Sequence, residues 1–333
     1  MAASKLSSKQ TTLFESKCAK ISAFYFDLDN TLIPTRAGDS KAIRKLSDLL
    51  ESQYHFSKDD ALLSTQTFLK SFRRCPDNTQ TSLDSWRTHL WRESLPPKYK
   101  HFADEIYPQW LRLRYRYLAV PADYVQLLTR MRRAGYALAL ITNGPSNAQW
   151  EKVARLNVRG YFDCVLVSSD LPWEKPHPEI FYAACNFLNV KPHECAMIGD
   201  KLETDIKGGH LAQLGLTFWT PLSSSSSAAQ SLDDVEYKPH HKLNQLLELY
   251  KYFPRLNAVA QPDAPSTSSR RSSYLSGGLT GASASGSGSG CSSSTSSQRS
   301  QPEKRQAAYR RGGSLPAMDC SNSEAENSCD SFL

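Results

Sequence analysis

The sequence lacks a long apolar segment. Its longest apolar run, around Tyr136 to Ile141, is far shorter than the roughly 20 residues that a membrane-spanning helix needs. The first ten residues also lack the apolar core of a secretory signal. We therefore expect a soluble, cytoplasmic protein that has no membrane partner.

Cysteine pairs with metal-binding or redox spacing are also absent. The chain has eight cysteines, and no two of them form a C-x-x-C pair. Several, such as Cys164, Cys185 and Cys195, fall within apolar segments. Such positions are typical of small core residues in a reducing compartment, which agrees with a cytoplasmic location.

Two further absences narrow the function. No G-x-x-x-x-G-K-[ST] motif occurs, which argues against a P-loop NTPase. The 333 residues include 40 basic and 33 acidic side chains, a formal charge of +7, and the basic residues are scattered along the chain. We therefore expect no binding to nucleic acid, whereas a mildly positive cleft for an anionic substrate fits this charge.

The C-terminal end of the chain has few apolar residues. Residues 256–333 are rich in Ser, Gly and Pro, so they cannot bury enough surface to offset their ordering entropy. We predict a disordered tail there and a flexible N-terminus over residues 1–19. The sequences around Ser272 and Ser314 resemble kinase sites, and the second has the spacing of a ligand for a phosphoserine adaptor.

Two hydrophobic patterns divide the remaining chain. Residues 36–120 show helical periodicity with almost no strand signal, which predicts an inserted, all-helical domain. Residues 20–35 and 121–255 contain short apolar runs that alternate with helical segments. This alternation predicts an α/β fold with a Rossmann-like parallel sheet covered on both faces, and a last helix near residues 242–252.

Two carboxylates follow the first expected strand. Asp27 and Asp29 interrupt the apolar sequence A-F-Y-F-D-L-D-N-T-L-I, which begins at Ala23. Alternate residues of a strand point the same way, so both carboxylates can face one site. Such a pair needs a cation or a shared proton, although the same residues could simply cap the next helix.

The other expected strands also end in polar residues. In an open parallel sheet, functional residues gather beyond the carboxyl ends of the strands, so we expect these residues to converge. They are Thr142, Asn143 and Gly144 after one strand, Lys175 in a following loop, and Asp200 and Asp205 after another.

These residue types suit the hydrolysis of a phosphate ester. Asp27 can attack phosphorus, while Asp29 can protonate the leaving alcohol and then deprotonate water. Asp27, Asp200 and the backbone carbonyl of Asp29 offer hard oxygen ligands for Mg²⁺. Lys175 can neutralise the charge of the nucleophile and the phosphate, and Asp205 can hold Lys175 or a metal-bound water.

A second group of residues is expected to face the substrate. The Thr142 hydroxyl can bind a phosphoryl oxygen, and we expect Asn143 and Gly144 to face the substrate in the same loop.

The four strand-end motifs resemble those of the haloacid dehalogenase superfamily. They are D-L-D-N-T-L from Asp27, I-T-N-G with Thr142, E-K-P-H-P-E-I-F with Lys175, and G-D-K-L-E-T-D from Gly199. The resemblance covers roughly residues 20–255. It implies a Mg²⁺-dependent phosphomonoester hydrolase that forms an aspartyl-phosphate and selects substrates with a helical cap. The inserted helical domain at residues 36–120 matches this cap.

The residues in and around the motifs indicate which members of the superfamily the chain resembles most. Dehalogenase members lack an acid at the position of Asp29, so this residue favours a phosphatase. The motifs are most similar to phosphatases that release phosphate from N-acylneuraminate 9-phosphate, which implies a small acidic sugar substrate and a role in sialic acid biosynthesis. The alternatives are another small phosphoester, such as a sugar phosphate, phosphoglycolate or a nucleotide, or a weakly active protein that binds partners through its tail.

Three residues bear on specificity and activity. If the substrate is an acidic sugar, an arginine should pair with its carboxylate, and we expect Arg114 to be this residue. The alternative is that Arg114 belongs to the basic, solvent-facing side of a helix. Lys201 stands where relatives usually have Thr or Ser, and it could weaken Mg²⁺ binding at Asp200. Pro34 stands where an acidic residue is common, and it could alter the hinge of the cap.

Overall fold

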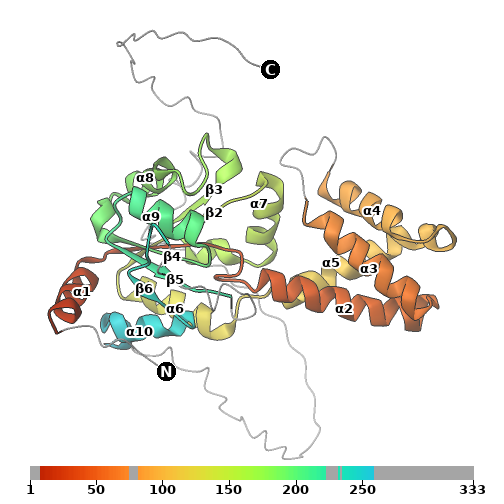
Figure 1. The fold of residues 1–333 in the computed structure, drawn as a ribbon, viewed down its shortest axis with the longest axis horizontal. Coiled ribbons are helices and arrows are strands. Elements are labelled where there is room, and N and C mark those ends of the chain that lie inside the picture. The colour runs from red at the N-terminus through yellow and green to blue at the C-terminus, as the bar shows by residue number, and fades with distance from the viewer. Residues whose placement is uncertain (1–7, 75–81, 223–231, 233–234, 259–333) are drawn as a thin grey trace, which may run out of the picture. The chain divides into compact units, whose positions relative to one another are not determined.

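A computed structural model of the protein describes residues 8–74, 82–222, 232 and 235–258. The predicted tail, with its motifs at Ser272 and Ser314, lies outside these residues. The described chain forms a sheet covered by helices and a separate group of helices, α2 to α5 (Figure 1).

The core is a parallel sheet, which confirms the predicted α/β class. In the described residues it has six strands in the order β3-β2-β1-β4-β5-β6. The strands are β1 (Ala23–Phe26), β2 (Ala137–Thr142), β3 (Cys164–Val167), β4 (Cys195–Gly199), β5 (Leu216–Trp219) and β6 (His241–Lys242). The strand order reverses between β1 and β4, and this is where open parallel sheets form a ligand crevice at their carboxyl ends.

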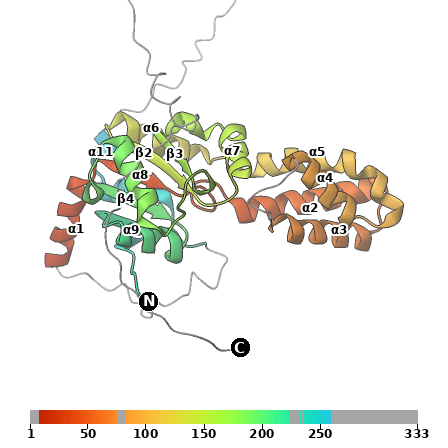
Figure 2. The same cartoon turned by 90° about the horizontal axis from the view of Figure 1, so that it is seen from above.

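Helices cover both faces of the sheet. Phe24 and Phe26 belong to the apolar cluster on the face of α6 (Ala122–Arg133), whereas Tyr25 packs on the other face with α8 (Pro178–Leu188). Figures 1 and 2 show α6 on one side of the strands and α9 (Lys207–Leu211) on the other. Strands β1 to β4 are nearly continuous apolar runs, as expected where both faces of a sheet are buried.

The structure also tests the expectation that the cysteines are core residues and the expectation that no helix spans a membrane. Cys18, Cys164, Cys185 and Cys195 are free and buried, as expected for small core residues. Among the helices that the structure describes, none combines the length and apolarity needed to cross a membrane.

The predicted flexible N-terminus is wrong over most of its length. Residues Ser8–Lys20 form helix α1. Phe14 of this helix packs edge-on against Phe218 and Tyr252, at ring-centroid distances of 6.3 and 5.5 Å. Burial of an aromatic ring offsets the entropy lost when the segment is ordered.

The single helix expected near residues 242–252 is also wrong. His241–Lys242 form strand β6, and α10 (Leu249–Tyr252) follows only after a short 3₁₀ turn. The Leu243 N–H donates to the Trp219 carbonyl at 2.8 Å, so the backbone continues to pair with β5 beyond the strand. Pairing with the open edge of the sheet therefore outweighs the local helical pattern.

The cap is helical, as expected. It consists of α2 (Thr35–Tyr54), α3 (Lys58–Phe72), α4 (Leu83–Ser94) and α5 (Ala103–Tyr117), with a 3₁₀ turn at Pro97–Phe102. Its apolar cluster is separate from those of the sheet and centres on Phe68, which stacks on Trp91 at 3.8 Å and meets Trp110 edge-on at 4.8 Å. The cap thus has a core of its own.

A buried ion pair joins the cap to the core. Arg87 of α4 lies 2.6 Å from Glu151 of α7 (Ser146–Arg155), and their side chains are 1% and 14% exposed. The Tyr115 ring of the cap also lies 5.2 Å from the guanidinium of Arg155, which pairs with Glu151 as well. Helix α7 of the core therefore contacts both α4 and α5 of the cap.

Glu151→Gln should destabilise the protein by about 3 kcal/mol, because Arg87 then stays buried beside a neutral amide. Glu93→Gln is a matched control, since Glu93 pairs with Lys100 at 3.3 Å on the surface, with 57% and 40% of the two side chains exposed. The control should cost less than about 1 kcal/mol. Urea unfolding measures both values, and equal losses would contradict this account of the ion pair.

Candidate active site

A buried lysine lies at the centre of the predicted site. The Lys175 ammonium is 2.7 Å from Asp27 Oδ1 and 2.7 Å from Asp205 Oδ1, and it donates to the Ile141 carbonyl at 2.7 Å. Its side chain is 1% exposed. The ammonium donates hydrogen bonds to Asp27 and to the Ile141 carbonyl and forms an ion pair with Asp205, which is how a charge this deeply buried is tolerated. The structure therefore brings Lys175, Asp27 and Asp205 together, as the sequence predicted.

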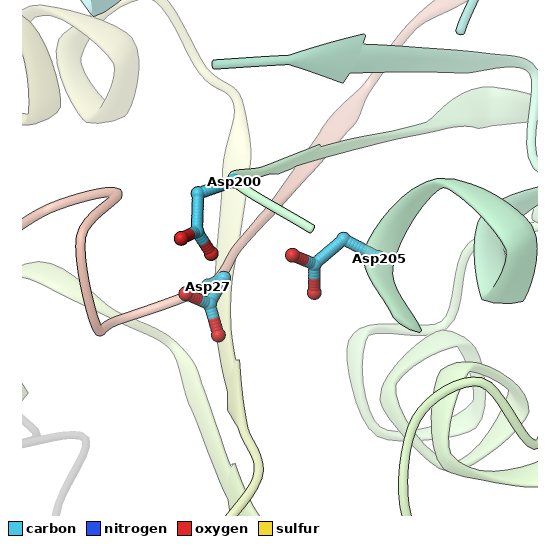
Figure 3. A group of neighbouring side chains, drawn as sticks. All are labelled: Asp27, Asp200 and Asp205. Carbon is cyan, nitrogen blue, oxygen red and sulfur yellow. The ribbon is translucent and has the colours of Figure 1, made fainter. Parts of the chain in front are cut away.

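Three carboxylates converge beside this lysine. Asp27 directly follows β1, Asp200 directly follows β4, and Asp205 lies in a π-helical turn at Leu202–Ile206, as Figure 3 shows. One carboxylate oxygen from each lies within 4.8 Å of the others. Gly199 is required for this arrangement, because a Cβ there would lie 2.2 Å from Asp205 Oδ2.

The electrostatics of the three carboxylates favour a cation. Burial raises the pKa of Asp27 to about 7, with Asp205 and Asp200 adding to the rise and Lys175 opposing it. Burial and Asp205 likewise raise the pKa of Asp200 to about 6. Asp200 Oδ1 is buried and has no hydrogen-bond partner among the described residues. Three carboxylates beside a single ammonium keep negative charge on hard oxygen atoms, which fits Mg²⁺.

This set differs in one member from the predicted metal ligands. The sequence predicted Asp27, Asp200 and the backbone carbonyl of Asp29, with Asp205 as a supporting residue. The structure places the Asp205 carboxylate in the cluster, whereas the Asp29 carboxylate has other partners. A contact from the Asp29 carbonyl stays a prediction.

Asp29 is held by three side chains. Lys152 donates to both of its oxygens, at 2.8 and 2.6 Å, Thr35 donates at 2.5 Å, and Gln149 donates at 3.2 Å. Burial alone would raise the pKa of Asp29, but the attraction of Lys152 and the hydrogen bonds from these three residues outweigh it and hold the pKa at about 2. Asp29 is therefore a carboxylate in this arrangement.

Sequence reasoning missed Lys152 and Gln149. They lie three residues apart on α7, so they share one face of the helix that follows the Thr142-Asn143-Gly144 loop. The spacing of three residues indicates that Lys152 and Gln149 share a helix face, but it does not identify Asp29 as their common partner.

The loop after β2 has two distinct roles. The Thr142 hydroxyl is buried and has no hydrogen-bond partner in the described part of the chain, so it is available for a phosphoryl oxygen. The Asn143 amide instead pairs with the Lys175 backbone, donating to its carbonyl at 2.7 Å and accepting from its N–H at 3.0 Å. Asn143 therefore fixes the Lys175 loop, and a contact with substrate stays a prediction.

Gly144 has a conformation that other residues rarely adopt. Its φ is +131°, and a Cβ would lie 2.6 Å from the amide nitrogen of Gln149. The glycine thus allows Gln149 to approach the loop and Asp29 together.

Arg114 is buried within the cap. Its Nε lies 2.8 Å from Asp39 Oδ1, and its guanidinium lies 4.8 Å from the Phe72 ring and 5.6 Å from the Trp110 ring. The alternative of a solvent-facing arginine is therefore wrong for this residue. Nη1 of Arg114 is buried and has no hydrogen-bond partner among the described residues.

Lys201 and Pro34 lie at the edges of the site. The Lys201 side chain is exposed, its N–H donates to Asp205 Oδ2 at 3.1 Å, and its charge opposes the rise in the pKa of Asp200. Pro34 immediately precedes α2, where the chain leaves the core for the cap.

Comparisons with known proteins identify the family to which these site residues belong. Residues 21–213 match the family of haloacid dehalogenase-like hydrolases. N-acylneuraminate-9-phosphatase from Homo sapiens is 33% identical over 242 residues, which cover 69% of this chain and 93% of that protein. Glyceraldehyde 3-phosphate phosphatase from Methanopyrus kandleri is 30% identical over 195 residues, covering 58% of this chain and 81% of the relative.

A solved structure, that of a HAD phosphatase from Thermococcus onnurineus, is 25% identical and has a TM-score of 0.46, covering 69% of this chain and 97% of that one. The matched family extends over more than half of the chain, from β1 to the end of α9, and includes the converging carboxylates and Lys175. The chain therefore belongs to the haloacid dehalogenase-like hydrolases and is a phosphatase of that family.

Proposed function

We propose that the enzyme hydrolyses phosphomonoesters through an aspartyl-phosphate at Asp27. The observation that supports this most is the contact of Lys175 with Asp27 Oδ1, which leaves Oδ2 free of that contact and able to attack phosphorus. Because its partners hold Asp29 as a carboxylate, Asp29 must take up a proton before it can act as an acid. As the new bond forms, the ester P–O bond breaks and the protonated Asp29 gives this proton to the leaving alcohol. Water then attacks phosphorus, Asp27 departs as a carboxylate, and Asp29 accepts the proton.

Other residues of the site hold the reacting groups. Thr142 would bind a phosphoryl oxygen through its unpartnered hydroxyl. Asp205 and Asn143 position Lys175 through its ammonium and its backbone, respectively. Bound Mg²⁺, held by Asp27, Asp200 and the Asp29 carbonyl, would supply positive charge that lets a carboxylate approach a phosphate dianion.

Lys201→Thr should tighten Mg²⁺ binding about threefold, because it removes an exposed positive charge beside Asp200. Lys191→Thr, an exposed lysine at the opposite end of β4, should leave the affinity unchanged. Titration calorimetry with Mg²⁺ measures both variants. Weaker binding by Lys201→Thr would show that Lys201 supports the site instead of opposing the ion.

We propose N-acylneuraminate 9-phosphate as the substrate. The support is the similarity to N-acylneuraminate-9-phosphatase, which extends along 93% of that protein. The archaeal relative favours a second candidate, glyceraldehyde 3-phosphate. Phosphate release from a panel of both compounds, phosphoglycolate and a nucleotide tests the choice, and the highest kcat/KM should belong to the sialic acid ester.

Arg114→Met should raise KM for N-acylneuraminate 9-phosphate by about tenfold or more, because a charge-assisted hydrogen bond to the sugar carboxylate is lost. KM for glyceraldehyde 3-phosphate, which has no carboxylate, should change by less than about threefold. Arg116→Met is the control, since Arg116 is exposed on the same helix. Equal increases for both substrates would assign Arg114 to the Asp39 ion pair alone.

A further inference from the structure

The ion pair between Lys152 and Asp29 is unusually well fixed for a lysine contact. The ammonium meets both carboxylate oxygens, at 2.8 and 2.6 Å, and the two side chains are 9% and 25% exposed. A lysine on a helix surface ordinarily leaves its ammonium in water. Here the apolar stem and the charge are both withdrawn from solvent, so the ammonium keeps a defined position relative to Asp29.

Helix α7 makes this position rigid. Gln149, on the same face as Lys152, donates to Asp29 at 3.2 Å and to the Asn143 carbonyl at 2.9 Å. Thr35 donates to Asp29 from the start of α2. Donors from two helices therefore fix both oxygens of the carboxylate, and Lys152 is the only charged one among them.

We propose that Lys152 is a positioning residue for the hydrolysis of the phosphoenzyme, a role that rests on the proposed function of Asp27 and Asp29. In this step the water oxygen bonds to phosphorus, the bond from phosphorus to Asp27 breaks, and Asp27 leaves with the electron pair. The water proton passes to Asp29. Lys152 holds the Asp29 carboxylate in the orientation in which it receives that proton.

Hydrolysis depends on this orientation more than the first transfer does. In the first transfer, the leaving oxygen is part of a substrate that the site already holds through its phosphate. In hydrolysis, the nucleophile is a single water molecule with no such tether, so its alignment depends on the groups that bind it. Loss of a positioning contact should therefore slow the second step more than the first.

The test is rapid-mixing kinetics of Lys152→Met with an aryl phosphate whose phenol is coloured. We expect kcat to fall by about 10 to 100-fold while kcat/KM stays within about threefold. A burst of about one phenol per active site should precede slow turnover, because the phosphoenzyme accumulates. The reduced kcat should be the same for an alkyl phosphate, since its leaving group has already departed.

Two further variants separate positioning from folding. Lys152→Arg, which keeps the charge, should recover part of kcat and reduce the burst. Lys251→Met should match the wild type, because Lys251 is 67% exposed in α10 and, in the described part of the chain, forms an ion pair only with Glu248. Circular dichroism confirms that each variant is folded.

Other outcomes overturn the proposal. Equal losses in kcat and kcat/KM without a burst would give Lys152 a structural role only, and a loss in kcat/KM confined to alkyl phosphates would assign it to the first transfer. Unchanged kinetics would remove any role. If the wild-type enzyme forms a phosphoenzyme and the variant shows no burst, only the proposed role of Lys152 is wrong. If the wild-type enzyme forms no phosphoenzyme, the proposed aspartyl-phosphate mechanism is wrong.

Discussion

Asp27→Asn should leave the protein folded and lower kcat by about 10⁴-fold or more. An amide is a poor nucleophile, so the phosphoryl group has no acceptor. Lys175 keeps its contacts with Asp205 and the Ile141 carbonyl, at 2.7 Å each, so the fold should tolerate the change. Release of phosphate from an aryl phosphate in the presence of Mg²⁺ measures the effect.

The control for this variant is Asp123→Asn. Asp123 is exposed in the first turn of α6 and is not part of the carboxylate cluster, so the activity of this variant should equal that of the wild type. Turnover by Asp27→Asn within about tenfold of the wild type would contradict the assignment of Asp27 as the nucleophile.

Lys175→Met should cost the protein both stability and activity. Without the ammonium, Asp27 and Asp205 remain buried with no positive partner at the position that Lys175 now holds, which should lower the free energy of unfolding by about 3 to 5 kcal/mol. Activity should fall by about 10³-fold, because the charge of the transferring phosphoryl group is no longer neutralised. Urea unfolding and phosphate release measure the two effects.

The stability of Lys175→Met should also depend on Mg²⁺. Because the ion would supply positive charge to the same carboxylates, it should recover part of the lost stability, whereas EDTA should not. Lys191→Met, at an exposed position, should change stability by less than about 0.5 kcal/mol under both conditions. A Lys175→Met protein as stable as the wild type in EDTA would show that the carboxylates do not need the ammonium.

Local patterns were enough to predict the framework. Strand β4 (Cys195–Gly199) is one of the short apolar runs expected in residues 121–255, and a buried parallel strand is such a run bounded by polar residues. Gly135, a residue type that often follows the last turn of a helix, ends α6 with a φ of +85°, and the Tyr136 N–H donates to the Met131 carbonyl. The same local signals place Asp27, Thr142 and Asp200 at strand ends, and the parallel sheet then brings these ends together.

Contacts between distant segments could not be predicted. The lysine that holds Asp29 lies 123 residues away from it, and its position on α7 indicates a face but no partner. The same holds for Arg87 and Glu151, each of which alone resembles an ordinary surface charge. Strand β6 and helix α1 depend on packing against β5 and its neighbours, which no local pattern records.

The formation of an aspartyl-phosphate at Asp27 is the central claim, and chemical trapping tests it most directly. The enzyme is mixed with substrate and Mg²⁺, quenched in acid and treated with borohydride, which reduces an acyl phosphate to an alcohol. Mass spectrometry of the peptide that contains Asp27 should then show homoserine at this position, only when substrate is present. An unmodified Asp27 under conditions of active turnover, or homoserine at another carboxylate such as Asp29, would contradict the account.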